Sequence, residues 1–310
     1  MGTEKIAILF NPSAGKGKAL REKEQMEKSL RRLEIPYDLF VSESEENLRE
    51  LAKRNSEKYR ILVGVGGDST FNIIVNEIRK AGATVNFGMI GLGSSNDITK
   101  EFDLDSLEKS CQALKRGRTK RIDLGYIAED KAILRYFLGQ ANIGLGVMVN
   151  KHVEELGRRK PGLAKKQTLA GVLAVIDSYR SKKIPIPLTI ESEKDRVEGE
   201  FILTIFSNIR YWATGRKIAP FALPDDGMLD GCLIHKCNFP RLISIALLAR
   251  AGKHSKAKEV RMLQSPYFEI SSQESFKIQT DGEIVGGLNG SSCFKKIQIK
   301  IIPQALILIC

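Results

Sequence analysis

Short apolar runs alternate with amphipathic stretches along the first third of the chain. The apolar runs have the length of strands and cover residues 5–11, 37–41, 60–65 and 87–92. The stretches between them carry apolar residues at helical spacing and cover residues 19–33, 45–55, 70–79 and 106–115. Regular alternation of strand and helix predicts a parallel sheet with helices on both sides.

The pattern changes after residue 121, where strand-like runs dominate. They cover residues 121–128, 132–141, 186–192, 199–208, 228–235, 267–272, 275–281 and 293–302. Helical patterns interrupt them at about 163–182 and 240–252. Many strands separated by glycine and polar turns predict a sandwich or an open barrel. We therefore expect an α/β domain over residues 1–123 and a mostly-β domain over 124–295, with a cleft between them and residues 296–310 returning to the first domain.

Composition narrows the classes of partner. The 310 residues carry a formal net charge of +12, which favours nucleotide phosphates, nucleic acid or acidic lipid headgroups, unless it only solubilises the surface. Aromatic residues make up 7% and do not alternate with basic ones as in binders of single-stranded nucleic acid, so we expect no nucleic-acid partner. Five scattered cysteines and the lack of an apolar run that could span a bilayer favour a reduced, cytoplasmic protein.

Three glycine-containing turns follow predicted strands of the first domain, at residues 11–18, 64–70 and 91–97. Ligands bind at the carboxyl edge of a parallel sheet, and glycine lets backbone N–H groups approach a phosphate. Lys16 and Lys18 add positive charge to the first turn. None of the turns is a Walker A motif. Taken singly, each also fits an ordinary strand-to-helix connection, and Asp68 also fits a helix N-cap.

In this order and spacing, the turns resemble the catalytic domain of the diacylglycerol kinase and sphingosine kinase superfamily, and they are most similar to its bacterial soluble lipid kinases. The family motif Asn-Pro-x-Ser/Ala-Gly is matched at residues 11–15, its Gly-Gly-Asp-Gly-Thr signature at 66–70 with Asn-Glu at 76–77, and its Pro-x-Gly-Thr-x-Asn-Asp motif at 91–97. The resemblance continues in the second domain at residues 121–125, 142–146, 218–230 and 281–283.

The resemblance implies an NAD-kinase-like fold and an ATP-dependent kinase that phosphorylates a hydroxyl of diacylglycerol or a related lipid. It implies that Asp68 and Asp97 hold the Mg²⁺ that accompanies the nucleotide, and that Glu283 draws the proton from the acceptor hydroxyl. It implies that Asp123 supports the cleft. Without the resemblance, Glu283 reads as a turn residue, because Asp-Gly between strands is a hairpin signal. The residues implied in nucleotide binding are Asn11, Ser13, Gly15, Lys16, Gly66, Gly67, Ser69, Thr70, Gly93, Ser94 and Asn96.

A structural Mg²⁺ site of the bacterial branch is also implied by the match at residues 225–230. Asp226 would supply its carboxylate, and backbone carbonyls near Leu223 and Met228 would complete the site. An acidic surface turn explains the same residues equally well.

The sequence departs from the family pattern at three positions. Ser69 replaces a glycine, and Gly91 and Ser94 replace proline and threonine. If the backbone at Ser69 needs a positive φ, its Cβ would interfere. A catalytically impaired lipid- or nucleotide-binding protein therefore stays as an alternative, as does a kinase of a soluble acceptor like the NAD kinases.

Basic residues are dense between positions 151 and 183, where they precede apolar residues at helical spacing. The segment fits an amphipathic element on anionic lipid, or equally a core-packed helix with a solvated basic approach. We expect a lipid substrate and peripheral attachment of a cytoplasmic protein to an anionic membrane surface, and leave a homodimer open.

Overall fold

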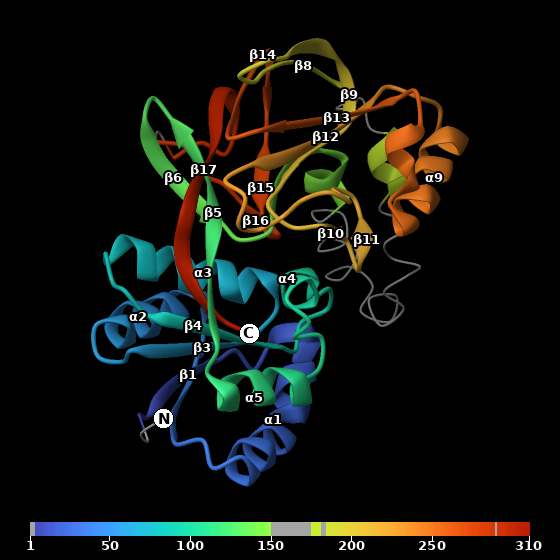
Figure 1. The fold of residues 1–310 in the computed structure, drawn as a ribbon. Helices are drawn as coiled ribbons and strands as arrows, with labels where there is room; N and C mark the ends of the chain where they lie inside the picture. Colours follow the sequence, from blue (N-terminus) through green and yellow to red (C-terminus); the bar gives the residue numbers. More distant parts are fainter. Residues whose placement is uncertain (1–3, 150–174, 181–183, 289) are drawn as a thin grey trace.

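The computed structural model describes residues 4–149, 175–180, 184–288 and 290–310. An α/β domain holds the N-terminal part of the chain, and a β domain lies against it (Figure 1). The sheet of the α/β domain is parallel, in the order β4-β3-β1-β2. Its elements are β1 (Ile6–Phe10), α1 (Ala14–Arg32), β2 (Tyr37–Val41), α2 (Glu45–Ser56), β3 (Ile61–Gly66), α3 (Asp68–Lys80), β4 (Asn86–Gly91), α4 (Asp97–Glu101) and α5 (Leu107–Arg116).

Alternation along the central strand sends its side chains to two separate cores. Ala7 and Leu9 of β1 pack in a cluster with α2 and α3. Ile6, Ile8 and Phe10 pack in a second cluster with α1 and α5. Because successive side chains of a strand point to opposite faces, the five apolar residues of β1 bury both faces of the sheet.

The strands of the β domain pair mostly antiparallel, and a separate two-stranded hairpin and an α-helix accompany them. A large cluster of buried apolar side chains forms its core, in which the rings of Phe206 and Phe268 lie 4.8 Å apart at an angle of 48°. Its elements are β6 (Ala132–Phe137), β7 (Gln140–Gly144), β8 (Ile186–Glu191), β9 (Arg196–Ser207), β10 (Tyr211–Trp212), β11 (Arg216–Lys217), β12 (Leu229–His235), α9 (Phe239–Leu248), the 3₁₀ turns η1 (Ala249–Ala251) and η2 (Lys253–Lys256), β13 (Val260–Ser265), β14 (Tyr267–Phe276), β15 (Ile278–Thr280) and β16 (Glu283–Ile284).

Two long strands connect the domains. The strands β5 (Thr119–Glu129) and β17 (Phe294–Ile309) pair antiparallel along most of their length and run side by side from one domain to the other (Figure 1). One half of β17 pairs with β14 of the β domain, and its end pairs in parallel with β4. The predicted fold class, an α/β domain followed by a β-sandwich-like domain, is confirmed. The predicted division at residues 123 and 295 stays a prediction.

The single strand predicted over 132–141 is wrong, because the chain breaks into β6 and β7 where the N–H groups of Leu138 and Gly139 donate to the Asp281 carboxylate. Helix α1 begins at Ala14, but residues 15–17 have a left-handed backbone, so its regular part starts after Gly17, close to the predicted start at residue 19. The basic segment at 151–174, and the helix predicted over 163–182 apart from its helical residues 175–180, lie outside the described residues. Within the described ranges, no helix is long and apolar enough to cross a membrane.

Candidate active site

The three glycine turns meet at one edge of the sheet. The strands β1, β3 and β4 are parallel neighbours, so their carboxyl ends lie side by side. A Cβ at Gly15, where φ is +60°, would lie 2.5 Å from the carbonyl oxygen of Leu92. A Cβ at Gly93 would overlap the Cα of Gly67. The turns thus pack backbone against backbone, and this close approach requires glycine at these positions.

Side chains of the predicted nucleotide site hold these turns in shape. The Nδ2 of Asn11 donates to the Oγ1 of Thr70 over 3.0 Å, which ties the first turn to the second. The Oδ1 of Asn96 accepts the N–H of Gly93 at 2.8 Å within the third turn. Ser13, Lys16 and Ser94 are exposed, and Gly66 is buried below them. The structure therefore brings the predicted nucleotide-site residues to one edge of the sheet. Through their hydrogen bonds, Asn11, Thr70 and Asn96 hold the backbone of the turns in place there.

Ser69 occupies an ordinary helical position. It is the second residue of α3, which Gly67 caps, and it is partly exposed. It is not among the described non-glycine residues that have positive φ. The conformational objection to a side chain at this position therefore does not hold.

Asp68, which is partly buried, and Asp97, which is buried, lie close together beside the turns. The two oxygens of Asp68 accept the N–H groups of Asp97 and Ile98, each over 3.2 Å, at the start of α4. Burial, together with the negative charge of Asp97, raises the pKa of Asp68 to about 7. Burial also raises the pKa of Asp97.

Asp97 also binds the β10–β11 hairpin of the β domain. Its Oδ1 accepts the N–H of Gly215 at 2.6 Å, and its Oδ2 accepts the N–H of Thr214 at 3.1 Å. Four residues further on, Glu101 accepts bonds of 2.9 Å from the backbone N–H and the guanidinium of Arg210. Helix α4 therefore fastens this hairpin through two carboxylates.

Asp281 is a structural anchor for the predicted base. Its buried carboxylate accepts hydrogen bonds from the backbone at residues 138–140 and from the Nδ2 of Asn72, at 2.9 to 3.0 Å. Burial raises the pKa of Asp281. Glu283 follows after one turn residue, and its Oε2 lies 4.0 Å from the Nη2 of Arg135. Asp281, two residues before Glu283 in the chain, and Arg135, next to its carboxylate, thus set the position of Glu283.

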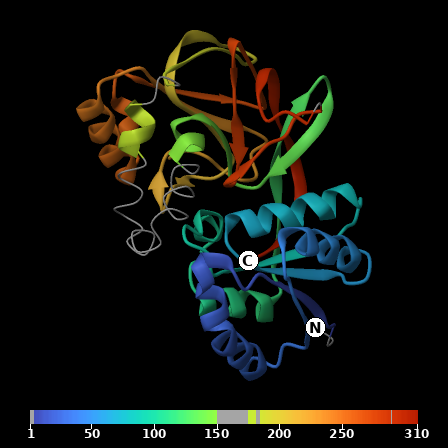
Figure 2. The same cartoon turned by 180° about the vertical axis from the view of Figure 1, so that it is seen from behind.

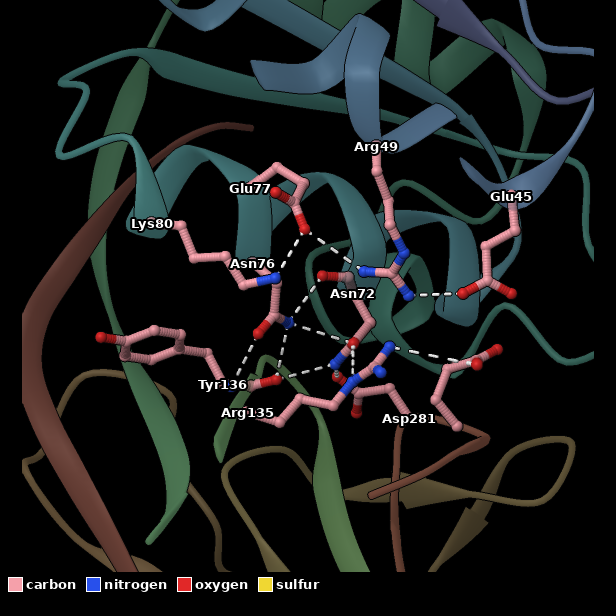
Figure 3. A network of polar contacts seen from close by, with 10 residues as sticks. Glu45, Arg49, Asn72, Asn76, Glu77, Lys80, Arg135, Tyr136 and Asp281 are labelled. Carbon is pink, nitrogen blue, oxygen red and sulfur yellow. Dashed lines mark hydrogen bonds and ion pairs between the residues drawn. The ribbon is translucent and has the colours of Figure 1, made fainter. Parts of the chain in front are cut away.

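Helix α3 contacts the β domain through asparagine amides (Figure 3). Asn72 accepts from the Nε of Arg135 over 2.8 Å, and Asn76 exchanges bonds of 2.9 and 3.0 Å with the backbone of Tyr136. Sequence reasoning missed Asn72 and Arg135. The available signal was two asparagines four residues apart on an otherwise apolar helix, because buried amides need partners.

Two family models together match nearly the whole chain. Residues 5–127 match the diacylglycerol kinase catalytic domain, and residues 139–310 match the YegS C-terminal NAD kinase beta sandwich-like domain. This chain belongs to the diacylglycerol kinase-type family of lipid kinases. As a member of that family it is a phosphotransferase with an alcohol group as acceptor, and ATP use is implied.

Relatives and a solved structure of this kinase family align over 90% or more of this chain. The diacylglycerol kinase of Staphylococcus saprophyticus is 24% identical over 303 residues, which cover 96% of this chain and 95% of that protein. The "Putative lipid kinase YtlR" of Bacillus subtilis is 25% identical over 289 residues, which cover 90% of this chain and 93% of that protein. The crystal structure of a diacylglycerol kinase from Bacillus anthracis has a TM-score of 0.71 at 15% identity and covers 100% of this chain and 97% of its own, which shows the shared fold.

The second predicted metal position of this lipid kinase lies beside the middle of the long strands, near the irregularity of β17 between Ile302 and Leu306. The carboxylate of Asp123 accepts the N–H groups of Gly227 and Gln304, each at 2.7 Å, and so holds the turn that contains Asp226. Asp226 itself accepts the N–H of Met228 at 3.0 Å, and the Leu223 side chain is exposed. Within the described ranges, no group of three or more acidic, histidine or cysteine side chains forms a metal cluster.

Asp230 is a further residue of this region that sequence reasoning missed. Its Oδ2 is buried without a hydrogen-bond partner among the described residues. Burial and the nearby charge of Asp226 raise the pKa of Asp230 to about 6. A buried, partnerless carboxylate oxygen close to a second carboxylate suits a hard cation.

Proposed function

We propose that this kinase transfers the γ-phosphate of ATP to a hydroxyl of diacylglycerol or a related lipid at a membrane surface. One observation carries the proposal: the turn that holds Asp281 and Glu283 is bonded to α3, the helix that begins with Asp68, and the charge of Asp281 acts on Asp68. Asn72, one helical turn after Asp68, makes this connection with a 2.9 Å bond to Asp281. The names of the relatives support the acceptor class.

The nucleotide would lie over the three turns. Exposed Ser13, Lys16 and Ser94 can reach phosphate oxygens, while Gly67 and Gly93 keep the backbone low enough for a close approach. Helix α3 begins at this edge, so its positive end would stabilise the phosphates. In this proposal Asn11, Thr70 and Asn96 keep the turns in the shape that binds ATP.

Asp68 and Asp97 have the chemistry of a magnesium site. Burial first, and then the negative charge of Asp97, raise the pKa of Asp68, and a divalent cation would stabilise the ionised form of both carboxylates. We propose that this pair holds the Mg²⁺ of the nucleotide, directly or through water. The ion would supply neutralisation of phosphate charge. By the same argument, Asp226 with the neighbouring Asp230 and the backbone near Leu223 and Met228 would hold a second, structural Mg²⁺.

Glu283 would act as the general base. Its side chain is partly exposed, so an acceptor hydroxyl can reach it, while Arg135 lies close on the buried side. The carboxylate would take the proton from the hydroxyl oxygen as that oxygen attacks the phosphorus. The bridge from Asn72 to Arg135 and Asp281 would keep the base aligned with the phosphate.

The test is transfer of labelled γ-phosphate from Mg·ATP to a panel of lipids in anionic mixed micelles, with NAD as a soluble acceptor. The panel contains diacylglycerol, monoacylglycerol, phosphatidylglycerol and sphingoid bases. Glu283→Gln should lower kcat by about 100-fold or more, because general-base catalysis contributes that much. Asp68→Ala should abolish transfer. Glu274→Gln, the same change at an exposed glutamate of β14, is the matched control and should keep full activity.

Each other outcome points to one alternative. Label on NAD alone would assign the protein to kinases of soluble acceptors. No label on any acceptor, in a folded protein, would favour a lipid- or nucleotide-binding protein without phosphoryl transfer. Unchanged transfer in Glu283→Gln would remove Glu283 from the mechanism.

A further inference from the structure

Helix α9 presents apolar side chains on both of its sides. Leu242 and Ile245 are buried in the β domain, whereas Ile243 and Leu247, one turn apart on the outer side, are 38% and 59% exposed. The helix lies at the outer edge of the β domain, away from the α/β domain, in both views (Figures 1 and 2). The buried side alone explains how α9 packs, so the exposed apolar residues indicate a surface that contacts something else.

The chain around and after this exposed stripe is strongly basic. From residue 241 to residue 258 every charged side chain is a lysine or an arginine. Arg241 pairs with Glu259 at 2.8 Å, and among the described residues no salt bridge reaches the other four, which are Arg250, Lys253, Lys256 and Lys258. The charge of Arg250 also lowers the pKa of Arg216, after the larger effect of burial, so these two cations lie near each other.

We propose that the outer face of α9, together with η1 and η2, is the surface through which this kinase docks on an anionic lipid bilayer. The docking surface consists of Ile243, Leu247, Arg250, Lys253 and Lys256. An exposed apolar stripe beside basic side chains is the arrangement that inserts between headgroups while its charges meet anionic lipid. The inference rests on the proposed lipid kinase function and names the surface that function would use.

The charge of the surface selects a bilayer over a second copy of the chain. Two copies that met face to face through the docking surface would bring Arg250, Lys253 and Lys256 of each together, and such like charges repel. Phosphatidylglycerol and other anionic headgroups complement the same charges. Phe221, 67% exposed beside Pro220, adds apolar area nearby, because Pro220 lies against Gly252 between η1 and η2.

The docking surface is continuous with the candidate active site through the β10–β11 hairpin. Gly252 lies against Lys217 of β11, and Asp97 holds the turn of the same hairpin at Thr214 and Gly215. A bilayer bound at α9 would therefore lie next to the element that reaches the predicted magnesium pair. This geometry would bring a membrane-embedded acceptor close to the nucleotide.

The test measures binding of the full chain to phosphatidylcholine vesicles with and without phosphatidylglycerol, by flotation in the absence of nucleotide and acceptor. Leu247→Glu should weaken binding to anionic vesicles by about tenfold or more, since it removes an inserted apolar group and adds a repelled charge. Arg250→Gln with Lys253→Gln should reduce the dependence on phosphatidylglycerol. Leu20→Glu is the matched control, because Leu20 lies on α1, carries basic neighbours and has the same exposure of 59%.

Distinct outcomes separate this inference from the proposed function. Equal binding by wild type and Leu247→Glu would overturn the inference, as would a loss in Leu20→Glu alone, which would move docking to α1. A concentration-dependent dimer that Leu247→Glu abolishes would assign the surface to a second copy instead. Vesicle binding through α9 without phosphate transfer to any lipid would keep the docking surface and refute the lipid kinase. Transfer to detergent-dispersed lipid without vesicle binding would support the lipid kinase function and refute the docking surface.

Discussion

The α/β domain holds the β domain at two places of opposite chemical character. At the first, helix α3 contributes neutral amides, and Asn72 and Asn76 bind the backbone and side chains around β6. At the second, helix α4 contributes carboxylates, and Asp97 and Glu101 bind the β10–β11 hairpin. One contact supports the predicted base, and the other lies beside the predicted magnesium pair.

The two contacts therefore differ in how they should respond to pH. The amides of α3 keep the same protonation at every pH, so on the α3 side of the first contact only the partner Asp281 can titrate. The carboxylates of the α4 region are desolvated, and the pKa values of Asp68, Asp97 and Glu101 are all raised. The α4 contact should therefore respond to pH and to a bound cation, which suits the side of the site that exchanges nucleotide.

The largest effect is expected when the amide contact is broken at its centre. Asn72→Ala removes a donor to the Asp281 carboxylate and the acceptor for the Nε of Arg135, leaving two buried charges with fewer partners. We expect a loss of about 3 kcal/mol in the free energy of unfolding, measured in urea. Asn76→Ala, which touches backbone and Asn72 only, should cost about 1 kcal/mol. Equal costs for the two variants would contradict the central role of Asn72.

A smaller loss of stability is expected when the charged contact is broken at Glu101. Glu101→Gln keeps an acceptor for Arg210 but removes the ion pair, and Arg210 is partly solvated, so the loss should be about 1 to 2 kcal/mol. Amide hydrogen exchange at Thr214 and Gly215 should become faster. The control is Glu108→Gln, which breaks an exposed pair with Arg32 and should cost less than about 0.5 kcal/mol.

The pH dependence of folding stability tests whether ionising Asp68, next to α4, costs free energy in the folded protein. With a folded pKa of about 7 and an unfolded value near 4, Asp68 binds its proton more tightly in the folded state. Folding stability through this group is therefore greatest at low pH and falls as pH rises toward 7. We expect the metal-free protein to be about 1 kcal/mol more stable at pH 6 than at pH 8. Asp68→Asn should remove this difference, and a stability that rises from pH 6 to pH 8 would refute the assignment.

The smallest effect is expected when an exposed lysine of α3 is removed from its ion pair. Lys80 pairs with Glu77 at 2.8 Å, but its side chain is mostly exposed, and Arg49 still pairs with Glu77 when Lys80 is removed (Figure 3). Lys80→Ala should change the free energy of unfolding by less than about 0.5 kcal/mol. Both ion pairs of Glu77 lie within the α/β domain, so a larger loss would mean that the contact between α2 and α3 depends on Lys80.

Much of the candidate site follows from local sequence. The apolar runs before each glycine turn predict neighbouring parallel strands, and neighbouring strands bring the turns at Gly15, Gly67 and Gly93 together. The buried α3–β6 contact was not predictable in this way. Asn72 bonds to Asp281, 209 residues away, and nothing in the local pattern of either residue names the other. The β10–β11 hairpin was missed because its strands have two residues each, too short for any periodicity.

The sequence alone therefore determined the periods of the strands and helices, the glycines that close packing demands, and the motifs that mark the family. The tertiary structure decided which carboxylates meet, that β17 joins both sheets, and that Asp281 breaks the strand predicted over 132–141. The physical reason is the separation along the chain over which each feature is decided. Backbone conformation and burial period depend on residues a few positions apart, whereas the partner of a buried charge is whichever group the packing of the whole chain brings within hydrogen-bonding distance.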